Sequence, residues 1–212
     1  LGTFLVIGVC FGTPSIKNRI LNNTTFTNTG LSITEGTVNN TVSLTDYSNT
    51  SISVANKVLP SIVGITVEYK VNSLFGGTST SKGAGSGIIV SSDGYILTNN
   101  HVVNSSSSSS YYQITEATKV TVKLYNDDTE YEAKIIGSDS QTDLAVIKID
   151  KTGLFAAKLG DSDAVQVGEF AMAIGNPLGL QSSISCGIIS ATNRDVHDSE
   201  TGITYNLIQT DA

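Results

Sequence analysis

The most informative part of the sequence is Gly83-Ala-Gly-Ser-Gly-Ile-Ile-Val-Ser-Ser-Asp-Gly-Tyr-Ile-Leu-Thr-Asn-Asn-His101, which predicts a β-hairpin. Ile88-Ile89-Val90 is a short apolar strand, and Asp93-Gly94 predicts a two-residue turn because glycine tolerates a positive φ. Tyr95–Thr98 then returns as the second strand of a β-hairpin. The polar pair Asn99-Asn100 follows and ends the strand pairing, so the hairpin places His101 at the end of a strand.

A second stretch complements the hairpin. Asp143 comes directly before the apolar strand Leu144–Ile149. A carboxylate held in the interior at such a place costs several kcal/mol unless it has a partner. A histidine is the natural partner, and we therefore expect Asp143 to lie close to His101.

Composition excludes several classes of protein. The formal net charge of −7 argues against a nucleic-acid partner, which selects a basic face. The two cysteines, Cys10 and Cys186, cannot supply a four-ligand zinc site, and the two histidines do not complete one. We expect neither a metal nor a cofactor. A hydrophobic content of 39% is sufficient for a folded core.

The first part of the chain differs from the rest. Residues 1–12 are nearly all apolar but too few to span a bilayer, so they predict the end of a longer membrane helix or signal segment; the alternative is a buried strand. Residues 13–57 are rich in Thr, Asn and Ser and show no sustained period. They predict a flexible tether, because such a stretch buries too little surface to offset its ordering entropy.

From Val58 onward, short alternating apolar runs are separated by turns, which is typical of an antiparallel barrel or sandwich. Residues 58–157 contain one group of strands, and residues 158–212 contain about three more. No stretch has convincing helical periodicity beyond one turn after His101. Three strands with an apolar face leave an open edge, so we expect the second group to be part of a larger unit.

Five blocks in this order resemble the HtrA/Deg family of trypsin-like serine endopeptidases: Thr98-Asn-Asn-His-Val-Val103, Gly137-Ser-Asp-Ser-Gln-Thr-Asp-Leu-Ala-Val146, Leu159-Gly-Asp-Ser162, Ala173-Ile-Gly-Asn-Pro177 and Ile208-Gln-Thr-Asp-Ala212. The resemblance covers about residues 58–212. It implies an all-β, trypsin-like double antiparallel β-barrel, with the first barrel in residues 58–157 and a partial second barrel in residues 158–212.

The resemblance also assigns roles. His101 corresponds to the general base and Asp143 to the acid that orients it, in the division of labour of a serine-protease triad. In the family, Gln-Thr-Asp-Ala leads into Ala-Ile-Asn-Pro-Gly-Asn-Ser-Gly-Gly, so we expect the nucleophilic serine beyond Ala212 and the 212-residue chain alone to be inactive. His197, in a polar loop, is interpreted as solvated.

The residues and the resemblance are compatible with two functions. The first is an HtrA/Deg-type serine endopeptidase that cleaves unfolded or damaged polypeptides in envelope quality control. The resemblance implies a possible homotrimer, and the first 12 residues suggest a membrane anchor with the protease domain outside the cytoplasm. The alternative is a non-catalytic relative that uses the same double barrel to bind polypeptides.

Overall fold

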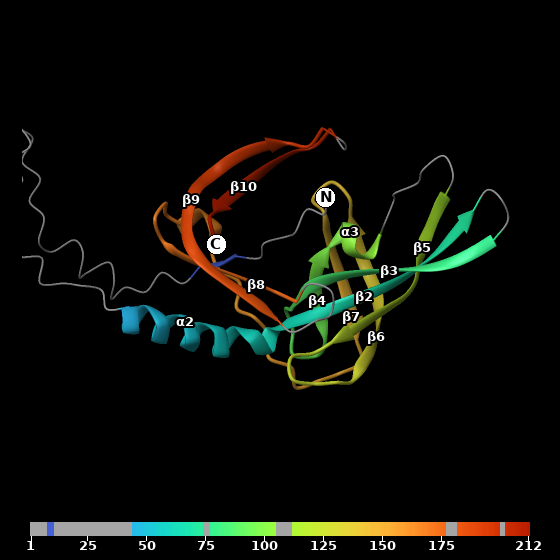
Figure 1. The fold of residues 1–212 in the computed structure, drawn as a ribbon, viewed down its shortest axis with the longest axis horizontal. Coiled ribbons are helices and arrows are strands. Elements are labelled where there is room, and N and C mark those ends of the chain that lie inside the picture. The colour runs from blue at the N-terminus through green and yellow to red at the C-terminus, as the bar shows by residue number, and fades with distance from the viewer. Residues whose placement is uncertain (1–7, 11–43, 74–76, 105–111, 177–181, 200–201) are drawn as a thin grey trace, which may run out of the picture.

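A closed six-stranded barrel is one of the two main units of the described chain (Figure 1). The computed structural model describes residues 8–10, 44–73, 77–104, 112–176, 182–199 and 202–212. All neighbouring barrel strands are antiparallel, in the order β2-β3-β4-β7-β6-β5, and the pairing of β2 with β5 closes the ring. The strands are β2 (Ile62–Ser73), β3 (Gly77–Ile89), β4 (Tyr95–Asn99), β5 (Tyr112–Lys123), β6 (Glu130–Asp139) and β7 (Leu144–Ile149).

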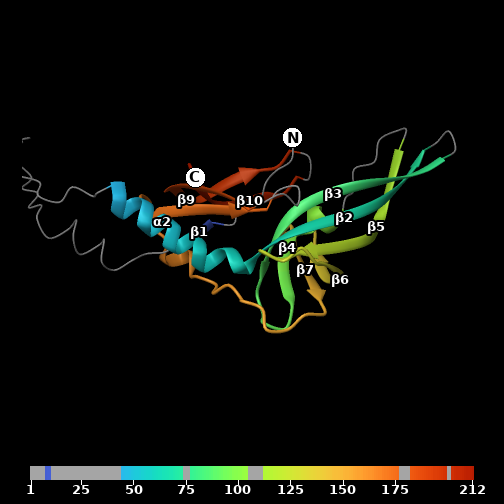
Figure 2. The ribbon, with the colours of Figure 1, turned by 60° about the horizontal axis from the view of Figure 1, so that its bottom comes forward.

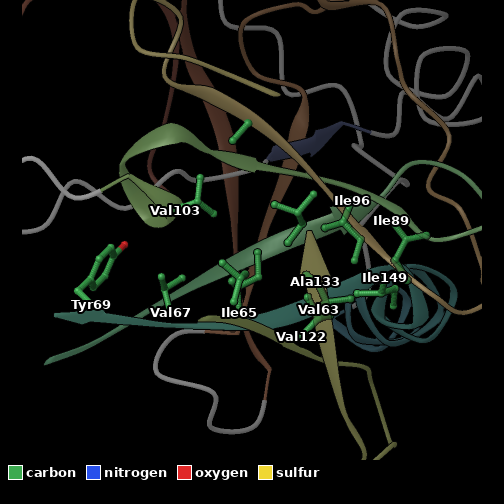
Figure 3. Packing of buried hydrophobic residues seen from close by; sticks show 13 residues of the cluster. Val63, Ile65, Val67, Tyr69, Ile89, Ile96, Val103, Val122, Ala133 and Ile149 are labelled. Atoms are coloured by element: carbon green, nitrogen blue, oxygen red, sulfur yellow. The ribbon is translucent and has the colours of Figure 1, made fainter. Parts of the chain in front are cut away.

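Alternation along the strands fills the barrel interior. On β2, the side chains of Ile65, Val67 and Tyr69 are buried, and on β7 the residues Ala145, Ile147 and Ile149 are buried. Every second residue of a strand points to the same face, so these side chains meet inside the ring. Figure 3 shows this cluster, with Val103 from outside the strands packed against it.

A second sheet lies beside the barrel. It is antiparallel in the order β1-β8-β9-β10, with the strands β1 (Gly8–Cys10), β8 (Phe170–Gly175), β9 (Ser183–His197) and β10 (Thr204–Thr210). Among the described residues, the connections include the short 3-10 helices η2 (Leu59–Ser61) and η3 (Ser162–Ala164). The chain is therefore all-β in its two main units, a closed barrel and a partial second sheet, as the sequence predicts.

The tether prediction is wrong for its last part. Residues 44–57 belong to the helix α2 (Leu44–Val58), which runs along the second sheet (Figures 1 and 2). Tyr47 stacks edge-on against Phe170, with ring centroids 5.6 Å apart, and Val54 packs against the cluster that contains Met172. Tertiary contacts thus stabilise a helix of poor intrinsic propensity. The rest of 13–57 lies outside the described residues.

The second hydrophobic cluster joins the two units. Ile62 and Ile88 come from the barrel, and Met172 and Ile174 come from β8. The end of α2 covers this junction with Val58. At its edge, the Asn176 backbone N–H donates to Ser86 Oγ at 2.7 Å.

Within the apolar run 1–12, the structure describes only Gly8–Cys10, which pairs with Ala171–Ala173 of β8. For these three residues the structure follows the alternative interpretation, a strand. The described helices include none with both the length and the apolar character needed to cross a membrane.

The hairpin before His101 differs in detail from the prediction. Its reversal spans four residues, because Val90 N–H donates to Tyr95 C=O at 2.9 Å and Gly94 N–H donates to Ser91 C=O at 3.1 Å. Gly94 has a φ of 105°, and a Cβ there would lie 2.4 Å from Ile149 C=O. Only glycine fits this place. The polar segment around His197, expected as a loop, is partly strand, since β9 continues to His197.

Candidate active site

His101 lies on α3 (Asn100–Val103), the single helical turn that follows β4. Val103 is fully buried in the barrel cluster, and the buried Tyr69 hydroxyl donates to Val102 C=O at 2.6 Å. These two contacts fix the turn on the barrel. The His101 side chain is left 45% exposed at the surface. The sequence allows at most one helical turn after His101, and the structure places this turn at Asn100–Val103, where it includes His101 itself.

Gly85 of β3 allows the turn to sit this close. A Cβ at Gly85 would lie 2.6 Å from Cγ1 and 2.7 Å from Cγ2 of Val102. A side chain there would push α3 away from the barrel. The glycine-rich start of the hairpin thereby sets the position of His101.

Asp143 precedes β7 and faces His101. Its Oδ2 lies 2.8 Å from His101 Nδ1, and its Oδ1 accepts from the His101 backbone N–H at 2.9 Å. The two residues are far apart in the sequence, but β4 and β7 are paired neighbours in the barrel, with Asn99 opposite Leu144. Asp143 itself has a φ of 55°, the left-handed conformation that aspartate tolerates better than most residues.

The contact defines a proton position. An ionised carboxylate only accepts hydrogen bonds, so the 2.8 Å contact with Asp143 Oδ2 requires the proton on His101 Nδ1. In the neutral imidazole, Nε2 then carries the free lone pair. An imidazole held in this tautomer and partly exposed can take a proton from a hydroxyl placed at Nε2.

Asn99 is part of the same arrangement, and the sequence did not reveal it. Its side-chain Nδ2 donates to both Asp143 Oδ2 and Asp143 C=O, each at 3.0 Å. The residue is only 4% exposed. The one feature of the sequence that could have indicated this role is a polar residue at the end of an apolar strand.

The second histidine and an aspartate near the end of the chain lie elsewhere. His197 is exposed on β9, where its Nδ1 lies 3.2 Å from Thr204 Oγ1. Asp211 accepts from Ile188 N–H at 2.8 Å and so binds the backbone of the second sheet. Within the described ranges, no serine hydroxyl bonds to the His101 ring, and no cluster of three or more His, Cys, Asp or Glu side chains could hold a metal ion.

The sequence profile of the family described as "Trypsin-like peptidase domain" matches residues 85–212, more than half of the chain. The match includes both His101 and Asp143. Two curated proteins are also similar to this chain in sequence. "Probable periplasmic serine protease do/HhoA-like" of Haemophilus influenzae is 43% identical over 144 residues, which is 65% of this chain and 28% of the relative. "Probable periplasmic serine endoprotease DegP-like" of Pseudomonas putida is 42% identical over 127 residues, 60% of this chain and 24% of the relative.

Solved structures agree with the sequence matches. The structure "HtrA-type protease AlgW with decapeptide" has a TM-score of 0.59 and 31% identity, covering 76% of this chain and 51% of that one. The structure "HtrA-type protease AlgW with tripeptide" has the same TM-score of 0.59 with 34% identity. The chain belongs to the HtrA/Deg family of trypsin-like peptidases.

This HtrA/Deg chain corresponds to part of its relatives. It spans about a quarter of the length of the two curated relatives, 28% and 24%, and about half of the AlgW chain, 51%.

Proposed function

We propose that the complete protein is a serine endopeptidase, with His101 as general base and Asp143 as the acid that orients it. The observation that supports this most is the pair itself: His101 Nδ1 lies 2.8 Å from Asp143 Oδ2, on a turn fixed to the barrel core by Val103. In this pair, Nε2 of His101 carries no proton and can accept one, and the side chain is 45% exposed.

The nucleophile in this proposal is a serine that follows Ala212 in the complete protein. His101 Nε2 takes the proton of that hydroxyl as it attacks the substrate carbonyl, and later returns it to the leaving amine. Asp143 keeps the imidazole in the Nδ1–H tautomer and stabilises the imidazolium that forms. Without this serine, the 212-residue chain would not hydrolyse peptides by this mechanism.

The proposed substrates are unfolded or damaged polypeptides outside the cytoplasm, in envelope quality control. Support comes from two relatives whose names call them periplasmic and from AlgW structures whose titles name bound peptides. Membrane attachment through residues 1–12 is supported by their apolar composition, although the pairing of Gly8–Cys10 with β8 favours a strand there. Assembly as a homotrimer rests on the family resemblance alone.

Hydrolysis of a reduced, unfolded polypeptide by the complete protein tests this function. We expect cleavage by the wild type and a loss of about 10⁴-fold or more for His101→Ala, because the general base is removed. The matched control is His197→Ala, which removes an exposed histidine of the second sheet and should retain full activity. An active His101→Ala enzyme would contradict the proposal. A protein that binds the polypeptide without cleaving it would instead be the non-catalytic relative.

A further inference from the structure

Asn99 is a buried polar residue whose side-chain donors both go to Asp143. It ends β4, and it is only 4% exposed in a setting of apolar strand residues. A buried amide without partners costs free energy, so the direction of its hydrogen bonds is informative. Both Asp143 C=O and Asp143 Oδ2 lie 3.0 Å from the same nitrogen, Nδ2. Since both of these oxygens only accept, the amide nitrogen must face them.

The two bonds join the backbone of Asp143 to its own carboxylate. Asp143 has a left-handed φ of 55°. Its C=O faces Asn99 Nδ2 and also accepts from the Asn100 backbone N–H at 3.0 Å. The same amide nitrogen then holds Oδ2. The carboxylate torsion is thereby fixed relative to the backbone at the atom that His101 Nδ1 contacts.

Asp143 needs such a constraint because it is not deeply buried. Its side chain is 29% exposed, so water can compete for its oxygens. Oδ1 is held by the His101 backbone N–H at 2.9 Å, but Oδ2 has only Asn99 Nδ2 and His101 Nδ1 as partners among the described residues. Without Asn99, only the two contacts with His101, one at the backbone N–H and one at Nδ1, would orient the carboxylate.

We propose that Asn99 is a positioning residue for the His101–Asp143 pair. Its amide holds Oδ2 in line with His101 Nδ1 and so selects the Nδ1–H tautomer that leaves Nε2 free. The proposal rests on the proposed function for its biological meaning. Its test does not, because the tautomer can be measured whether or not the protein hydrolyses peptides.

The experiment is ¹⁵N NMR of the imidazole nitrogens in the complete protein, at about pH 9, well above the ordinary pKa of an imidazole. Nitrogen shifts give the ratio of the Nε2–H to the Nδ1–H tautomer of His101. In Asn99→Leu, which keeps the shape but removes the amide, we expect this ratio to rise about tenfold, because a hydrogen bond to a charged group is lost. Hydrogen exchange of the His101 backbone amide, bonded to Asp143 Oδ1, should accelerate in parallel.

Asn104→Leu is the matched control. Asn104 flanks the other end of α3, and its Nδ2 donates to Asn100 Oδ1 at 2.8 Å and to Ser138 Oγ at 2.9 Å, not to Asp143. It should leave the His101 tautomer ratio unchanged. Thermal unfolding followed by circular dichroism establishes that each variant is folded, and Asn99→Ser takes the place of Asn99→Leu if the leucine variant does not fold.

The outcomes are distinct. A shifted His101 tautomer ratio in a folded Asn99 variant, with Asn104→Leu unchanged, supports the positioning role. A folded Asn99 variant that keeps the wild-type ratio overturns it, even when its stability is lower, because a purely structural role would move stability alone. An equal shift in the Asn104 variant also overturns it, since the effect would then come from α3 in general.

Discussion

Asp143 shows how one residue can connect backbone geometry to proton chemistry. Its backbone has a left-handed φ of 55°, and its C=O accepts from Asn99 and Asn100. Its carboxylate contacts two nitrogens of His101, the backbone N and Nδ1. Such a conformation is uncommon outside glycine, asparagine and aspartate, and it persists only where surrounding contacts hold it. Here the contacts that hold the backbone also orient the carboxylate.

Asp127, in the turn between β5 and β6, has a pKa that depends on its hydrogen bonds. The pKa of Asp127 is lowered from 3.8 to about 2, first by hydrogen bonds from Thr129 and then by the Tyr131 hydroxyl. These bonds close the turn between β5 and β6: Thr129 N–H donates to Oδ1 at 2.9 Å and the Tyr131 hydroxyl donates to Oδ2 at 2.8 Å. Because the folded pKa is depressed, this stabilisation is fully present above about pH 4 and is lost as the pH falls through about 2.

The measurement is an NMR titration of the Asp127 carboxyl carbon. We expect a midpoint near 2 in the wild type and a midpoint closer to 3.8 in Thr129→Val, which removes the side-chain donor. A wild-type midpoint already near 3.8 would show that these hydrogen bonds do not hold the turn in solution.

At the scale of elements, the position of α3 depends on the strand beneath it. Gly85 of β3 faces the Val102 side chain, and a Cβ there would come within 2.6 Å of it. We expect Gly85→Ala to destabilise the protein by about 1–3 kcal/mol, as overpacking in a well-packed interior does. It should also displace the His101 amide resonance, because α3 must move. Denaturant unfolding and an amide spectrum measure the two effects.

Gly137→Ala is the control for this substitution. Gly137 is also a strand glycine, on β6, but nothing lies within 4 Å of the position of its Cβ. An alanine there should be neutral or stabilising by up to about 1 kcal/mol, because it only restricts the unfolded chain. Equal losses of stability for the two variants would show that contact with Val102 is not the cause.

The barrel and the histidine–aspartate contact could be predicted because their signals are local. Turn residues and alternation mark the hairpin before His101, and an acid directly before an apolar strand marks Asp143. The role of Asn99 could not be predicted in this way. It depends on the pairing of Asn99 with Leu144 across β4 and β7, a tertiary relation that no short spacing in the sequence specifies.

The helix α2 was missed for a different reason. Ser, Thr and Asn dominate its sequence, LTDYSNTSISVANKV, and these residues compete with helical hydrogen bonding. Its apolar and contact residues nevertheless recur at helical spacing, at Tyr47, Ser51, Val54 and Val58. The contacts that stabilise it, to Phe170 and to the Met172 cluster, come from the second sheet, so the helix propensities of its own residues do not predict them.

The start of β3 could not be predicted for the same reason. It is a Gly/Ser/Thr-rich segment, and its strand conformation depends on full pairing with β2.

At the scale of the whole molecule, the barrel and the second sheet are joined by a shared apolar cluster and by polar contacts at its edge. Ser86 connects the two: its hydroxyl accepts from Asn176 N–H at 2.7 Å, and its C=O accepts from the Thr98 hydroxyl at 2.8 Å. Thr98 lies on β4, three residues before His101. The second sheet is thus tied to the strand that carries the proposed base.

The barrel holds the His101–Asp143 pair in place, and in the proposed mechanism a nucleophile that follows the second sheet has to meet His101 Nε2. The reaction therefore depends on how the two units are joined, and it can be measured in the complete protein.

The decisive measurement is covalent labelling of the complete protein with a fluorophosphonate, followed by mass spectrometry of the modified residue. We expect one label per chain, on a serine that follows Ala212, and a labelling rate at least about a thousandfold lower in His101→Ala. A complete protein that stays unlabelled, or that is labelled equally fast without His101, would rule out His101 as the general base of such a serine.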